Sequence, residues 1–100
     1  MYKKILISLS LLVGSAQAHT AIMSCFDNGD ENIVCEGGFS DGSSASGILF
    51  FIKQNETTVM ETRMNEDSEV VFRKPQGAYT VHFDAGEGHK IAIKGEDIVE

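Results

Sequence analysis

The sequence predicts an all-β protein, a small antiparallel β-sandwich of the Ig-like kind, with about seven strands and one disulfide. Short runs of alternating apolar and polar residues are separated by glycine, asparagine, aspartate and proline. No segment longer than a turn repeats its apolar residues at helical spacing. The two cysteines lie close together in the chain on either side of a hairpin-turn signal, as expected for a bridge between two adjacent strands.

The strand boundaries follow from the turn signals, since residues that turn the chain or cannot continue a ladder recur at 55–56, 65–67, 75–77 and 85–88. We therefore expect strands at residues 20–26, 33–37, 47–53, 57–64, 69–73, 78–84 and 90–94. The serine- and glycine-rich segment 37–47 is expected to be a long crossover loop between two sheets. Its amides or hydroxyls could alternatively contact a ligand.

The first eighteen residues have the pattern of a secretory signal peptide. Lys3 and Lys4 precede an apolar run that is too short for a membrane span, and the segment ends in Ala-Gln-Ala at Ala18. We expect residues 1–18 to be removed, which leaves a β-sandwich domain at 19–100 and takes the net charge from −7 to −9. The mature protein is then expected in the periplasm and not embedded in a membrane.

Cys25 and Cys35 are expected to form the disulfide, because an exported chain meets an oxidising compartment. The Asn28-Gly29 pair between them is a strong hairpin signal, so the bridge should join two adjacent strands. A two-thiolate metal site is the alternative, but a second cysteine pair is missing from the sequence. The acidic stretch 27–32 lacks the ligand spacing of an EF-hand and is expected to be a solvated turn.

The charge balance narrows the choice of partners and reactions. Fifteen acidic residues against eight basic ones argue against nucleic acid, whose affinity depends on Lys and Arg neutralising phosphates. The sequence contains no nucleophile elbow and no close acid pair in a pocket-forming apolar stretch, so we do not expect an enzyme.

Strand parity assigns the faces of the strand at 78–84. Tyr79, Val81 and Phe83 share one face, which we expect to be the core, so His82 should point outward. Because hairpin pairing preserves faces, Val81 or Phe83 should lie opposite Ile91.

Histidine is the residue type that points to chemistry. Cleavage after Ala18 would make His19 the first residue, with an α-amine and an imidazole that can close a chelate ring on one ion. Such an arm suits Cu(II) or Ni(II). The alternative is that His19 has no role in metal binding and that cleavage falls before a histidine by chance.

A second candidate lies in the turn Asp84-Ala85-Gly86-Glu87-Gly88-His89. Its glycines would let Asp84, Glu87 and His89 approach one point, and mixed nitrogen and oxygen ligation suits a divalent transition ion. His82 is a reserve ligand, which could reach this site only if the strands paired in a different register. A solvated acidic hairpin is the alternative for this turn.

The stretches 36–42 (EGGFSDG), 61–72 (ETRMNEDSEVVF) and 75–81 (PQGAYTV) resemble small transthyretin-like or carboxypeptidase-regulatory-like β-sandwiches. The last stretch, continued into 84–89 (DAGEGH), is similar to the ending of periplasmic accessory components of nickel/cobalt energy-coupling-factor transporters. This resemblance implies binding of Ni(II) or Co(II) for a membrane uptake system, with His89 and Asp84 carried over. His19 resembles the N-terminal histidines of periplasmic copper carriers.

The sequence therefore predicts an exported protein that binds one divalent transition metal and presents it to a membrane transporter component. His19 and His89 would supply nitrogen ligands, and Asp84 or Glu87 an oxygen ligand or a hydrogen-bond acceptor. Ni or Co is the expected metal, and Cu is the alternative. A metal-free adaptor that binds proteins through the serine- and glycine-rich loop and exposed strand edges is the competing hypothesis.

Overall fold

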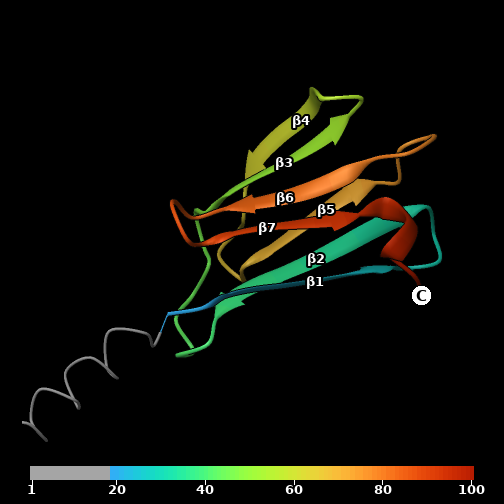
Figure 1. The fold of residues 1–100 in the computed structure, drawn as a ribbon. Coiled ribbons are helices and arrows are strands. Elements are labelled where there is room, and N and C mark those ends of the chain that lie inside the picture. The colour runs from blue at the N-terminus through green and yellow to red at the C-terminus, as the bar shows by residue number, and fades with distance from the viewer. Residues whose placement is uncertain (1–18) are drawn as a thin grey trace, which may run out of the picture.

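The computed structural model describes residues 19–100, so the predicted signal peptide at 1–18 lies outside the described residues. Seven strands form two antiparallel sheets that pack as a sandwich (Figure 1). Their bounds are β1 (Ala21–Asp27), β2 (Asn32–Phe39), β3 (Leu49–Gln54), β4 (Thr57–Arg63), β5 (Glu69–Arg73), β6 (Thr80–Asp84) and β7 (Lys90–Lys94). The predicted all-β sandwich with seven strands is confirmed.

The sheets have the strand orders β1-β2-β5 and β4-β3-β6-β7. The chain crosses between them after β2, after β4 and after β5, while the other connections are hairpins. A short 3-10 helix, η1 (Gly95–Asp97), follows β7 and was not expected from the sequence. Within residues 19–100, no helix is long and apolar enough to cross a membrane.

The core is built from alternate residues of the strands, because successive side chains of a strand point to opposite faces. Tyr79, Val81 and Phe83 are all buried, as strand parity predicted, and Phe83 is the one of the two expected residues that pairs with Ile91. The remaining buried apolar residues are Met23, Ile33, Cys35, Ala45, Phe50, Ile52, Met64, Val70, Phe72 and Ile98.

β2 extends further than the sequence suggested. Its last residues, Gly37 to Phe39, were assigned to the crossover loop because they are rich in glycine, but they pair with β1. Gly37 is needed there, since a Cβ at this position would come within 2.6 Å of Met64 Sδ and 2.9 Å of Phe83 Cε2. The glycine therefore marks a close approach of the two sheets and not a loop.

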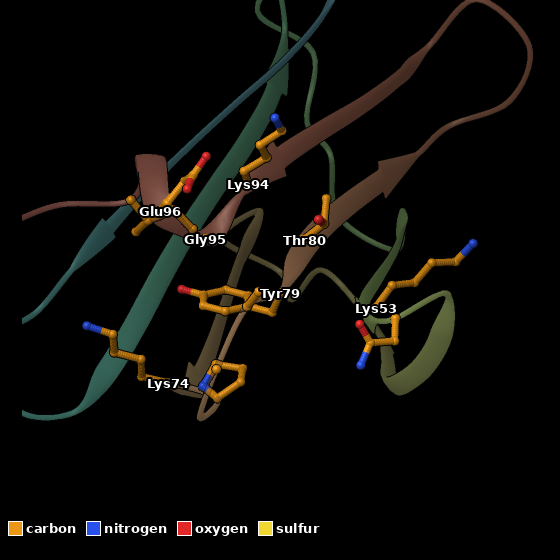
Figure 2. A pocket seen from close by; sticks show the side chains of 12 residues that line it. Lys53, Lys74, Tyr79, Thr80, Lys94, Gly95 and Glu96 are labelled. Carbon is orange, nitrogen blue, oxygen red and sulfur yellow. The ribbon is translucent and has the colours of Figure 1, made fainter.

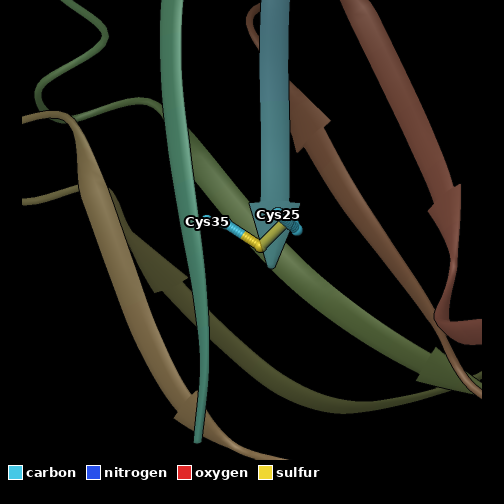
Figure 3. Close-up of a disulfide and its surroundings, with 2 residues drawn as sticks. All are labelled: Cys25 and Cys35. Atoms are coloured by element: carbon cyan, nitrogen blue, oxygen red, sulfur yellow. A yellow bond between two sulfur atoms is a disulfide. The ribbon is translucent and has the colours of Figure 1, made fainter. Parts of the chain in front are cut away.

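The predicted disulfide joins Cys25 of β1 to Cys35 of β2, which lie directly opposite each other in the ladder (Figure 3). The expected turn lies between them, with Gly29 at φ 86° and its N–H donating to Asp27 Oδ1 at 2.9 Å. Because the bridge consumes both thiols, neither is available for the alternative two-thiolate metal site.

Candidate functional site

The candidate site lies at one end of the sandwich, where β1 begins and the turn between β6 and β7 closes (Figure 1). The pairing of β1 with β2 continues beyond Ala21 and Phe39: Ser40 N–H donates to the Thr20 carbonyl at 2.8 Å, and Thr20 N–H donates to Ser40 Oγ at 3.0 Å. One step further, His19 Nδ1 lies 2.6 Å from Asp41 Oδ2. The hairpin thus places a carboxylate opposite the predicted terminal histidine.

Asp41 is held in place by Ser43, whose hydroxyl and backbone N–H donate to Asp41 Oδ1 at 2.6 and 3.0 Å. The hydrogen bonds from the Ser43 hydroxyl and amide lower the pKa of the Asp41 carboxyl below its usual value, and His19 adds to the effect. Asp41 is therefore an ionised oxygen donor at neutral pH.

Sequence reasoning missed Asp41, although the signal was available. Once Cys25 is placed opposite Cys35, each step back along β1 is a step forward along β2, so residue 19 faces residue 41. The register of a single predicted disulfide hairpin would have found it.

His89 is positioned by the tight turn between β6 and β7. Its N–H donates to the Gly86 carbonyl at 2.9 Å, and its own carbonyl accepts from Ala85 N–H at 3.0 Å. The ring Nδ1 lies 3.0 Å from the Glu87 carbonyl, which can only accept, so in the neutral ring Nδ1 carries the proton. Nε2 is then the nitrogen with a lone pair for a ligand.

His19 and His89, seventy positions apart in the sequence, line the same hollow of about 220 Å³. Its walls are completed by Phe39, Ser43, Ile48 and Ala85, and the Phe39 and His89 rings meet edge to face at 6.4 Å between centroids. The hollow is open, since the His19 side chain is 63% exposed. The structure thus brings together the two histidines that the sequence singled out.

The acids of the predicted turn lie differently. Asp84 Oδ1 accepts from Gly86 N–H at 2.9 Å, and Oδ2 lies 4.0 Å from Lys90 Nζ. Asp84 lines a separate hollow of about 210 Å³ together with His82, and Glu87 is exposed. Within residues 19–100, no three side chains of His, Cys, Asp or Glu are grouped closely enough to hold a metal ion.

His82 points outward from β6, opposite Ala92 of β7, as expected. Its ring stacks on Phe51 of β3, with centroids 4.7 Å apart and planes 3° from parallel. Partial burial, and to a lesser extent the positive charge of Lys53, lower the pKa of His82 below 6.5. It takes part in an aromatic contact away from the hollow that His19 and His89 share.

We expect His82 to make folding stability depend on pH on the acidic side of neutrality. The pKa of His82 is lower in the folded than in the unfolded chain, so as the pH falls the unfolded chain is protonated first. The free energy of unfolding is therefore unaffected by His82 above about pH 6.5 and decreases as the pH falls through the two pKa values. Urea unfolding at about pH 5 and about pH 8 measures the effect, which His82→Gln should reduce. An unchanged pH dependence in His82→Gln would contradict this prediction.

His19 and His89 therefore share an open hollow at the end of the sandwich where β1 begins. The ionised Asp41 carboxylate contacts His19 but does not line the hollow. Comparisons of the chain with protein-family models, with curated proteins and with solved structures gave no match.

Proposed function

We propose that this chain is an exported protein that binds one divalent transition metal ion at the end of the sandwich where β1 begins, and presents it to a membrane transporter. The observation that supports this proposal most directly is the hollow that His19 and His89 share. Export to the periplasm is supported by the disulfide, since such bridges persist in oxidising compartments.

The donors at the hollow suit a transition ion. His89 offers Nε2, because its Nδ1 faces the Glu87 carbonyl. His19 offers its imidazole and, in a chain processed to begin at this residue, its α-amine. Asp41 is the nearest carboxylate and would exchange its contact with His19 Nδ1 for a bond to the ion. A nitrogen-rich set with one oxygen suits Ni(II), Co(II) and Cu(II).

This arrangement also suits delivery. Within residues 19–100 the His19, His89 and Asp41 side chains are not grouped closely enough to hold an ion as they stand, so the His19–Asp41 contact must rearrange when the ion binds. An exposed site with few ligands leaves coordination positions open to an acceptor. Ni(II) or Co(II) is the cargo proposed from the resemblance to nickel/cobalt uptake accessories, and the amine–imidazole arm makes Cu(II) the alternative.

The test is a titration of metal-free protein that begins at His19 with Ni(II), Co(II), Cu(II) and Zn(II), followed by calorimetry and by the NMR signals of the histidine rings. We expect one ion to bind and to perturb His19 and His89 but not His82. His89→Ala, and separately one extra glycine before His19, should each weaken binding at least about tenfold, the factor for about 1.4 kcal/mol.

His82→Ala is the matched control, because it removes a histidine of the same sheet that lies outside the hollow. It should leave the metal affinity unchanged. If no ion perturbs His19 or His89 at micromolar concentration, or if His82→Ala weakens binding as much as His89→Ala, the proposal fails. The transport role predicts that cells carrying His89→Ala accumulate less nickel or cobalt than cells carrying the native chain.

A further inference from the structure

A second and larger pocket lies at the other end of the sandwich, where β3 and β7 end and β6 begins (Figure 2). Its volume is about 660 Å³, within the range of pockets that bind small molecules. Lys53, Lys74 and Lys94 border it, Glu96 is the one acid among its lining residues, and Tyr79 forms part of its wall. Pro75, Ala78 and Ile98 supply apolar surface.

The charge of this pocket is opposite to that of the rest of the domain. Setting aside Lys3 and Lys4, the domain has six Lys and Arg residues and fifteen acids, yet the pocket takes three of the six and one of the fifteen. A concentration of one charge sign in a concave site attracts ligands of the other sign. The pocket therefore favours an anion in a protein that otherwise repels anions.

The three lysines differ in what holds their amines. Lys74 Nζ lies 3.2 Å from Asp27 Oδ2, and Lys53 Nζ lies 5.8 Å from the centre of the Phe51 ring. Lys94 extends outward and forms no ion pair with any residue of 19–100 (Figure 2). All three stems are flexible, so their amines can turn toward a bound anion.

Tyr79 places a fixed hydrogen-bonding group beside the pocket. The residue is only 7% exposed, its ring meets Phe72 edge to face, and Gly95 packs so closely that a Cβ there would collide with the ring. Its hydroxyl is the only buried side-chain nitrogen or oxygen of residues 19–100 without a hydrogen-bond partner. Burial raises the pKa of Tyr79, so the hydroxyl keeps its proton and is a donor at neutral pH.

We propose that this pocket binds a small organic carboxylate. The carboxylate would accept from the Tyr79 hydroxyl and from the amines of Lys74 and Lys94, with Lys74 exchanging Asp27 for the ligand. The hydroxyl lies on the side of the ring between Lys74 and Glu96 (Figure 2), and the Lys74 side chain is half-exposed, so it can move when a ligand binds.

A carboxylate fits better than a phosphate. Arginine forks and runs of backbone amides at a helix N-terminus give a phosphate oriented hydrogen bonds, whereas lysine acts on it only as a point charge. Arginine is missing from the lining residues, and η1 has only three residues. Glu96 on the rim also disfavours a doubly charged anion, whereas the apolar surface of Pro75, Ala78 and Ile98 suits the body of an organic acid.

The proposal is tested with metal-free protein and benzoate, followed by backbone amide shifts in NMR. We expect saturable shifts confined to residues 53–55, 74–80 and 94–98, and none with benzamide, which has the same shape but no charge. Lys94→Gln should weaken binding about tenfold, the effect of losing a charge-assisted hydrogen bond. Tyr79→Phe should weaken it about threefold or more without changing the far-UV spectrum.

Lys90→Gln is the matched control, because Lys90 and Lys94 lie on the same face of β7 and only Lys94 lines the pocket. It removes the same charge and should change the affinity less than twofold. Equal losses in Lys90→Gln and Lys94→Gln would overturn the proposal, as would unsaturable shifts or stronger binding of inorganic phosphate at the same residues. The probe contains no metal, and the pocket shares no lining residue with the hollow of His19 and His89. A failure of the carboxylate proposal would therefore leave the proposed metal function unaffected.

Discussion

Replacing Phe83 by alanine is expected to lower the free energy of unfolding by about 3–5 kcal/mol, the usual cost of removing a large buried ring. Phe83 is a fully buried residue of β6, and its ring meets Phe39 edge to face at 5.9 Å between centroids. The neighbouring side chains can fill little of the cavity that the substitution leaves, because strands of both sheets surround it. Domains of this size have total stabilities of about 5–15 kcal/mol, so a large share of the variant should be unfolded under mild denaturing conditions.

Phe26→Ala is the matched control for this prediction, since Phe26 is also in a strand but lies 37% exposed on the outer face of the three-stranded sheet. Its loss should be much smaller, about 1 kcal/mol or less. Guanidinium unfolding of both variants measures the difference. Similar losses in the two variants would contradict the assignment of the core faces.

Reducing the disulfide should lower the free energy of unfolding by about 2–3 kcal/mol, the chain-entropy value for a closed loop of this length. The effect is large for a small domain, because its core alone supplies limited stability. Urea unfolding with and without a non-thiol reductant measures it.

The double variant Cys25→Ala and Cys35→Ala provides the control, since the reductant should have no effect on it. A change in stability of that variant on adding reductant would show that the reductant acts elsewhere. Equal stability of the oxidised and reduced native chain would contradict the prediction.

Most of the fold could be predicted from local sequence patterns. The faces of the β6–β7 hairpin were predictable, because alternation in 79–83 and in 90–94 places Val81, Phe83, Ile91 and Ile93 on the core side. The register was predictable only to two choices, Val81 or Phe83 opposite Ile91, and the structure has Phe83 there. The ends of the strands were harder to predict from the sequence. Glycine at 37 and 38 suggested a loop, whereas Gly37 is required because Met64 and Phe83 approach it closely from the opposite side of the sandwich. That requirement comes from contacts distant in sequence, which periodicity does not record.

The candidate site shows the same division. His19 and His89 were chosen for their chemistry, but their common hollow depends on how two hairpins of different sheets are placed. Asp84 and Glu87 were chosen for closeness in sequence, and hydrogen bonding within the turn instead directs Asp84 to the Gly86 amide. The lysine-bordered pocket combines residues of three separate segments, and no local pattern indicates it.

The bond between Cys25 and Cys35 has a consequence for the site at the far end of the same hairpin. A ladder that slips by two residues keeps every side chain on its original face, so burial alone penalises such a slip weakly. A slip of this kind would place Phe39 or Ser43, in place of Asp41, opposite His19. The covalent link excludes both alternatives, so oxidation of two thiols distant from the hollow determines which oxygen donor stands beside its first histidine.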